Sequence, residues 1–240
     1  MLLGPLAMKI QFFSPKSLKK GLTTMVLLLH AFSGSIAFGQ QSETFKQKGF
    51  SLTFISQDKS LDPALKSRMV ETFYEVYPKL VKEFNKKALK EVVFIVDTSY
   101  EGVAATSDGK VTFSSNWLKL HPEDIDVVTH EVMHIVQDYG NTNGPGWLTE
   151  GIADYVRYKF GVDNAGAHWS LPDYKAGQSY KNSYRITAKF LDWLETDGHK
   201  GMVKNMDKHL RDHTYSDELW RQYTGRTLDE LWSKYTESQS

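Results

Sequence analysis

The sequence predicts an α+β fold in which a small mixed sheet with helices precedes a series of further helices. Three observations favour this class. Short segments with strand character are confined to the chain before residue 115. From residue 122 onward, apolar residues recur at helical intervals instead. Apolar residues make up 40% of the 240-residue chain and aromatic residues 13%, so a sizeable core can form.

The first 39 residues or so have the three parts of a secretory signal. Four lysines at positions 9, 16, 19 and 20 precede the apolar stretch 25–29, and small residues follow, with cleavage expected near Ala37-Phe38-Gly39. Met8 is an alternative start. An uncleaved anchor or a buried N-terminal helix are alternative interpretations of this segment. The chain has no cysteine, hence no disulfide scaffold, which favours a bacterial periplasmic or secreted protein.

Charge and cysteine content exclude several classes of function. The chain holds 29 basic and 29 acidic residues, but the signal contains four lysines and no acidic residue, so residues 40–240 hold 25 basic and 29 acidic residues. This mild acidity gives no basic patch for nucleic acid and no reason to expect stable membrane insertion after cleavage. A thiol nucleophile is excluded. We expect a monomer that acts on a peptide or protein substrate.

The first half of the mature chain alternates strands with one long helix. Residues 63–86 repeat apolar residues at helical intervals, and Pro78 inside this stretch predicts a kink or a division. A central strand is predicted at 91–96, where the apolar run is continuous. The other predicted strands are residues 50–55, which alternate in polarity, and 102–106 and 110–114, which flank a turn.

The segment 127–137 carries the pattern on which the functional interpretation depends. His130 and His134 are four residues apart, so a helix places both imidazoles on one face, where they can bind zinc. Glu131 lies about 100° further round the helix and can reach a zinc-bound water without being a ligand. The alternative is that both histidines are ordinary helix residues without metal.

The metal helix, which carries both histidines, has predicted boundaries at Pro122 and Gly140. Proline suits the first turn of a helix, and the acidic residues at 123, 124 and 126 complement its positive end. Glycine can end it. Ile125, Val128, Val132 and Val136 form the buried stripe.

The third ligand is predicted in the next helix, which runs to about Phe160. Glu150 and Asp154 are four residues apart and share a face. Glu150 completes a set of two histidines and one glutamate, and Asp154 can accept a hydrogen bond from the other ring nitrogen of His130. A third histidine six residues after His134 is excluded because Gly140 occupies that position.

The rest of the chain is predicted to be mostly helical, without internal repeats. We expect one domain over 40–240, divided into a sheet subdomain with the metal helix at 46–140 and a helical subdomain at 141–240. The later helices are predicted at residues 179–196, 202–212, 217–223 and 228–235.

Several segments resemble the plant basic secretory protein family and its bacterial relatives, zinc peptidases of the gluzincin type. The resemblance extends over most of the mature chain. It is carried by HEVMHIVQ at 130–137, GWLTEGIADYVRYKFG at 146–161, His168-Trp169, SYRITAKFL at 183–191 and TGRTLDELW at 224–232.

This resemblance implies a zincin-like architecture. A sheet subdomain places its edge strand, expected at Val111 to Ser114, along a cleft above the metal helix, and a helical subdomain closes the other side. By this similarity Glu150 is the third zinc ligand and Asp154 the aspartate one turn later. The acidic motif by which aminopeptidase N-like enzymes capture a free amino terminus has no counterpart before His130, which favours an endopeptidase.

A zinc peptidase of this type needs a base and an oxyanion donor. Glu131 would take a proton from the zinc-activated water and return it to the leaving amine. A donor besides the metal is needed for the oxyanion, and Tyr184 is the first candidate and His168 the second. Gln137 and Asn143 are candidates for binding substrate backbone. The alternative function is a non-catalytic zincin-fold protein that binds partners in the cell envelope; the presence of Glu131 favours the enzyme.

Overall fold

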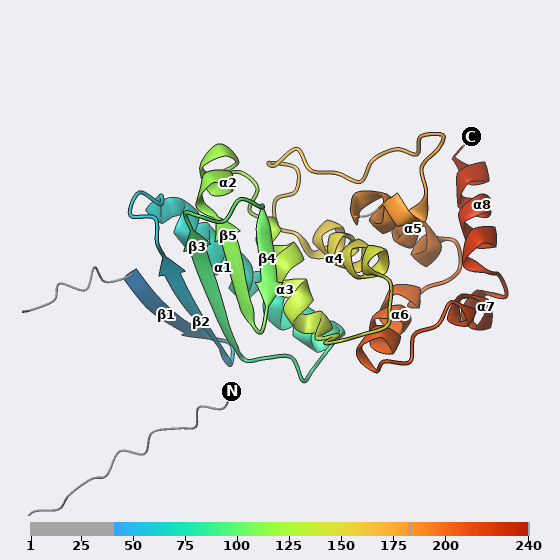
Figure 1. Cartoon of the computed structure of the whole chain (residues 1–240), viewed down its shortest axis with the longest axis horizontal. Coiled ribbons are helices and arrows are strands. Elements are labelled where there is room, and N and C mark those ends of the chain that lie inside the picture. The colour runs from blue at the N-terminus through green and yellow to red at the C-terminus, as the bar shows by residue number, and fades with distance from the viewer. Residues whose placement is uncertain (1–40, 183, 240) are drawn as a thin grey trace, which may run out of the picture. The chain divides into compact units, whose positions relative to one another are not determined.

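A five-stranded sheet followed by helices makes up the described part of the chain, which confirms the predicted α+β class (Figure 1). This computed structural model describes residues 41–182 and 184–239, so the predicted signal lies outside the described residues. The strands are β1 Gln41–Gln47, β2 Phe50–Ser56, β3 Glu91–Asp97, β4 Ala104–Ser107 and β5 Lys110–Ser114. The sequence did not predict β1.

The sheet is mixed and has the strand order β1-β2-β3-β5-β4. β2, β3 and β5 are parallel neighbours, whereas β1 and β4 are antiparallel to the strands that they flank. The edge strand is therefore β4, and the expectation that Val111 to Ser114 forms the edge was wrong. Val111 and Phe113 are buried and suit an inner strand, while β4 consists of small and polar residues, which suit an edge.

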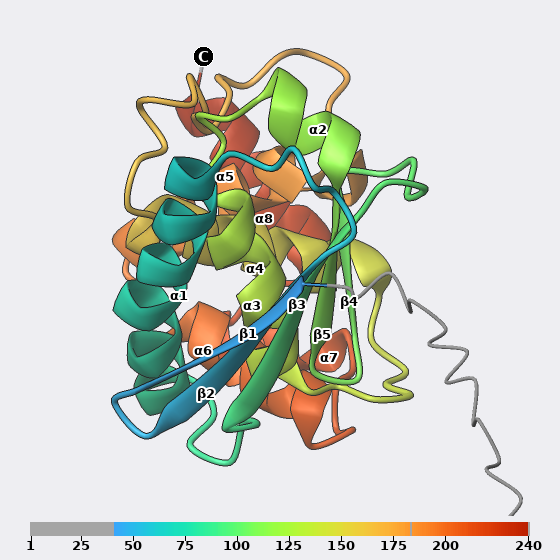
Figure 2. The ribbon, with the colours of Figure 1, turned by 90° about the vertical axis from the view of Figure 1, so that its left-hand side faces the viewer.

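The core of the sheet half lies between the strands and two helices, α1 Pro63–Glu83 and α3 Val127–Gln137. Figure 2 shows both helices on one side of the strands. Phe94 of β3 contacts Phe73 of α1 and Phe113 of β5 edge to face. All three phenylalanines are fully buried, and each such side chain stabilises the fold by about 1.5–3 kcal/mol. This packing fixes α1 against the sheet, and α3, the metal helix, in turn contacts α1 and β4.

Helix α1 continues through Pro78 without division. Its N-cap is Asp62, whose carboxylate accepts a hydrogen bond from the backbone N–H of Ala64 at 2.9 Å. Met69, Val76 and Leu80 belong to the predicted stripe and are fully buried. Buried apolar area thus outweighs the backbone hydrogen bond that proline cannot donate.

The metal helix begins at Val127, five residues after the predicted start at Pro122. The acidic residues before it have other partners. Asp124 accepts hydrogen bonds from Arg157 at 2.6 Å and from the indole of Trp117 at 3.2 Å. Asp126 is fully buried and accepts from the backbone N–H groups of residues 162 and 163. These contacts hold 122–126 in turns and anchor the loop after residue 160 to the start of the metal helix.

The helical half begins with α4 Gly146–Phe160, against which α5 Tyr184–Thr196 packs closely. A Cβ atom on Gly151 of α4 would lie 2.2 Å from Cγ2 of Thr187, a fully buried residue of α5. Only glycine permits this approach. The other helical elements are α2 Ser115–Leu120, which the sequence did not predict, the 3-10 turn η1 Tyr180–Asn182, α6 Met202–Arg211, α7 Glu218–Thr224 and α8 Leu228–Ser238.

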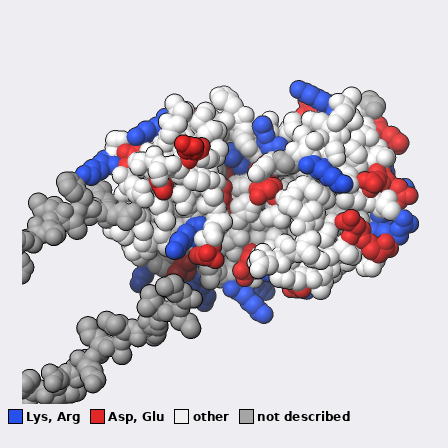
Figure 3. All heavy atoms as spheres, viewed as in Figure 1, with Lys and Arg blue, Asp and Glu red and all other residues white. Residues whose placement is uncertain are grey.

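Charged side chains of both signs are interspersed over the face shown in Figure 3. Among the described residues, no helix is both long enough and apolar enough to cross a bilayer.

Candidate metal centre

The metal helix α3 presents the two imidazoles side by side. Their Nε2 atoms lie 3.2 Å apart, and the ring planes meet at 79°. The opposite face of the helix is held in the core by Val128, Val132 and Val136, all fully buried. The i,i+4 spacing therefore produces the shared face that the sequence predicts.

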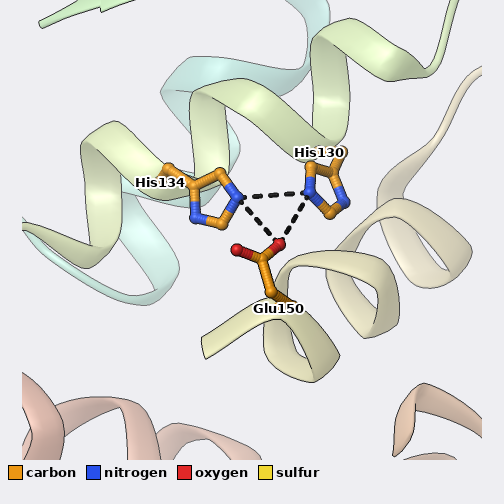
Figure 4. A group of neighbouring side chains, drawn as sticks. All are labelled: His130, His134 and Glu150. Atoms are coloured by element: carbon orange, nitrogen blue, oxygen red, sulfur yellow. Dashed lines mark hydrogen bonds and ion pairs between the residues drawn. The ribbon is translucent and has the colours of Figure 1, made fainter. Parts of the chain in front are cut away.

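Glu150 approaches both histidines from α4 (Figure 4). Its Oε2 atom lies 3.3 Å from Nε2 of His130 and 3.4 Å from Nε2 of His134. Three potential ligand atoms from two helices thus form a nearly equilateral triangle. The structure brings together the three residues that the sequence nominates as metal ligands.

Each imidazole uses its second nitrogen to contact an oxygen acceptor. Nδ1 of His130 lies 2.7 Å from Oδ1 of Asp154, as the sequence predicts for this pair. Nδ1 of His134 lies 2.6 Å from Oε1 of Gln137, whose amide nitrogen in turn donates to the carbonyl of Thr149 at 2.9 Å. Gln137 is only 2% exposed and holds His134, although it also lines the cavity at the site, and its suggested role in binding substrate backbone stays a prediction.

The donor set fits a divalent cation. Because both Nδ1 atoms donate to oxygen, the Nε2 atoms of the two imidazoles carry lone pairs when the rings are neutral, and these atoms face each other and the Glu150 carboxylate. Three acceptors at such distances repel one another unless a cation or a proton lies between them. Ligands at 2.0–2.1 Å in a tetrahedron around zinc would be about 3.3 Å apart, which matches the three edges.

The pKa values of the residues in the triangle also indicate that positive charge is favoured there. Burial alone would lower the pKa of His130, but hydrogen bonds to Asp154 and Glu150 outweigh it and raise that pKa to about 10. Burial would raise the pKa of Glu150, yet hydrogen bonds to His130 and His134 lower it to about 2. Without metal, a proton on His130 supplies the positive charge.

This raised pKa predicts proton release on metal binding. At pH 7.5 the metal-free protein holds His130 protonated, and zinc must displace that proton, so we expect about one proton released per zinc bound. Zinc affinity should rise with pH towards 10. The stability that the His130 proton provides is full below pH 6.5 and is lost as pH rises towards 10, so the Tm of the metal-free protein should fall over that range.

Isothermal titration calorimetry in two buffers of different ionisation enthalpy measures this proton count. An identical binding enthalpy in both buffers, hence no released proton, would contradict the protonated state of His130.

Glu131 lies beside the triangle in a cavity of about 1050 Å³. Its carboxylate Oε2 is 2.7 Å from the hydroxyl of Thr106 in β4. The lining includes the three candidate ligands, Trp117 and His121, which precede α3, and Tyr139 and Gly140, which follow it. We call this cavity the cleft.

Tyr184 begins α5 and lines the cleft beside His130. The two rings stack at 28° with centroids 6.1 Å apart. Its φ of 42° lies in the left-handed region, which is uncommon for a bulky residue and often marks functional sites. The negative charge of Glu150, followed by burial, raises the pKa of the Tyr184 phenol, so this hydroxyl remains a donor at neutral pH.

His168 also lines the cleft, on the loop between α4 and α5. It is exposed and has a φ of 50°. Next to it, the ring of Trp169 lies 4.4 Å from the guanidinium of Arg157, the residue that pairs with Asp124. Asn143 does not line the cleft, and its suggested substrate contact stays a prediction without support from this cavity. Sequence reasoning missed Thr106 and Arg157.

Comparisons with known proteins agree with this architecture. A family model described as "Peptidase of plants and bacteria" matches residues 37–235. No curated protein sequence matches the chain.

Two solved structures share the fold at low sequence identity. An aminopeptidase N family protein from Idiomarina loihiensis aligns with a TM-score of 0.52 and 12% identity over 81% of this chain and 46% of its own. Aminopeptidase A from Legionella pneumophila aligns with a TM-score of 0.55 and 16% identity over 81% and 27%. This chain thus spans less than half of either protein. The zincin-like fold predicted from the sequence is confirmed.

Proposed function

Because the chain belongs to the family of peptidases of plants and bacteria, we propose that it is a zinc-dependent endopeptidase with Glu131 as general base. The observation that supports this most strongly is the triangle of three acceptor atoms, 3.2–3.4 Å apart, with Glu131 in the same cleft. His130, His134 and Glu150 would hold the metal and leave the fourth position of a tetrahedron for water.

Different residues of the chain have different roles in peptide hydrolysis. When bound, zinc would polarise the scissile carbonyl and lower the pKa of its water towards about 7. Glu131 accepts a proton from the attacking water and returns one to the leaving amine. Asp154 and Gln137 keep the two imidazoles in the tautomer that directs Nε2 at the ion.

Tyr184 is proposed as the hydrogen-bond donor to the oxyanion, because its ring lies against His130 and its phenol stays protonated. Tyr184→Phe should lower kcat about 10²–10³-fold and leave zinc content unchanged, since the missing hydroxyl acts only when the oxyanion forms. His168→Gln should lower kcat less. Steady-state kinetics with metal analysis compares the two variants; a larger loss for His168→Gln would reverse the assignment.

An internal cleavage site is favoured by the extent of the cleft. Its lining continues past the metal ligands in both directions, and β4 offers a free strand edge beside it. An extended peptide could pair with that edge by adding a strand. Both similar structures are described as aminopeptidases, so cleavage of a free N-terminal residue is the competing activity.

A peptide library with blocked and with free ends, with and without a chelator, tests the proposal. We expect chelator-sensitive cleavage of internal bonds irrespective of the blocking group. Release of N-terminal residues from unblocked peptides alone would show an aminopeptidase. Cleavage of neither set by the zinc-loaded protein would refute a peptidase of either kind.

We further propose that residues 1–39 direct export and that the mature protein acts as a monomer. The order of lysines, apolar residues and small residues supports export. N-terminal sequencing of the exported chain and its mass in solution test the two statements.

A further inference from the structure

Strand β4 carries a residue that contacts the proposed base directly. Along β4 the side chains alternate, with Ala104 and Thr106 half-buried and Ala105 and Ser107 exposed. The half-buried side faces the metal helix, because the hydroxyl of Thr106 reaches Glu131 there. One strand residue thus connects the sheet edge to the general base.

The contact has the geometry of a charge-assisted hydrogen bond. Oγ1 of Thr106 lies 2.7 Å from Oε2 of Glu131 and 3.0 Å from the backbone carbonyl of the same residue. A hydroxyl has one proton, and the closer, charged carboxylate is the better acceptor. Within the described chain, Thr106 is the donor that the structure gives to this carboxylate, which belongs to a residue only 6% exposed.

The backbone of Thr106 faces the open edge of the sheet. Ser114 N–H donates to the carbonyl of Val103, so the pair Val103 and Ser114 is hydrogen bonded across the hairpin. In an antiparallel pair, residues that hydrogen bond to the partner strand alternate with residues that do not. Ala105 is therefore hydrogen bonded to β5. The backbone N–H and C=O groups of Ala104 and Thr106 point away from β5. These outward groups are the ones that an added strand would use.

We propose that Thr106 is a positioning residue that fixes the Glu131 carboxylate relative to the strand edge where the substrate backbone pairs. The inference rests on the proposed function of the cleft. With Oε2 held by Thr106, Oε1 is the oxygen that exchanges the proton with water and with the leaving amine. The backbone of Thr106 then positions the substrate, and its hydroxyl positions the carboxylate of Glu131.

Two substitutions separate the hydroxyl from the shape of the side chain. Thr106→Val keeps the branched side chain and the strand backbone but removes the donor, and Thr106→Ser keeps the donor. We expect Thr106→Val to lower kcat about tenfold to a hundredfold, since small displacements of a catalytic group have effects of this size. KM should stay within about twofold and zinc content should not change. Thr106→Ser should retain kcat within about threefold.

Thr112→Val is the matched control. Thr112 lies in β5, pairs with Ala105 and is half-buried in the same sheet. Its replacement therefore measures how a threonine-to-valine change in this sheet affects activity when no contact with Glu131 is removed. Its kcat should equal that of the parent. An equal kcat in Thr106→Val and the parent, or an equal loss in the Ser and Val variants, would overturn the inference.

Crystal structures provide a readout that does not depend on turnover. The parent and Thr106→Ser should show Glu131 in one conformation with Oε2 bonded to residue 106. In Thr106→Val the carboxylate should rotate or occupy several conformations. An unchanged, single conformation there would also overturn the inference. If the parent cleaves no peptide, the proposed function fails on its own, and the carboxylate conformations still decide the role of Thr106.

Discussion

Replacement of Glu131 by glutamine is expected to lower kcat about 10²–10⁴-fold and to leave one zinc bound per chain. The amide has nearly the same shape, and its carbonyl can still accept the hydrogen bond from Thr106, so packing is preserved. It cannot take a proton from water, however, and general-base catalysis contributes rates of this order. The three candidate ligands are untouched, which explains the retained metal.

Peptide cleavage and zinc content are measured on the same preparation of this variant. Glu218→Gln, at the start of α7 and outside the cleft, is a suitable control and should match the parent in both. If Glu131→Gln cleaved peptides at the parent's rate, another group would have to act as the base.

Replacement of Glu150 by alanine is expected to weaken zinc binding by more than about a hundredfold. Loss of a residue that only orients a ligand typically costs ten- to a hundredfold in metal affinity, and Glu150 supplies one corner of the triangle itself. Activity should be lost together with the metal. Zinc should also stop raising the Tm, because a ligand stabilises only the fold that binds it.

Zinc content after dialysis and Tm with and without zinc measure this effect. Glu218→Ala serves as the control for removal of a glutamate near a helix start. Stoichiometric zinc in Glu150→Ala would show that the ion is held elsewhere, and the assignment of Glu150 would have to be abandoned.

The secondary structure was predictable where the sequence pattern is local. The strand at 91–96 and the helix from Pro63 follow from polarity alone, and both are present. Strand β1 was missed because Phe45 is its only apolar residue and all its other residues are polar. The order of β4 and β5 depends on pairing with β3, a contact between segments that a local pattern does not encode.

In the candidate site, too, contacts within one helix were predictable from the sequence, and contacts between distant segments were not. The spacing of His130 and His134 is a property of one helix and was readable. The contact of Gln137 with His134 also lies within α3 at i,i+3, so helical spacing could have indicated it, although the sequence analysis suggests only a substrate role. Thr106 could not be found in this way, because its contact with Glu131 requires the fold to bring residues 25 apart together.

The close approach of α4 and α5 at Gly151 has a consequence for comparing relatives of this protein. A single added methyl group there would lie 2.2 Å from Thr187, so α4 and α5 would have to move apart, and these helices carry Glu150 and Tyr184. We expect a homologue with alanine at this position to bind zinc less tightly, to turn over substrate more slowly, or both. A search for the histidine motif alone would not recognise such a chain as different, so glycine directly after the ligand glutamate is a useful second criterion.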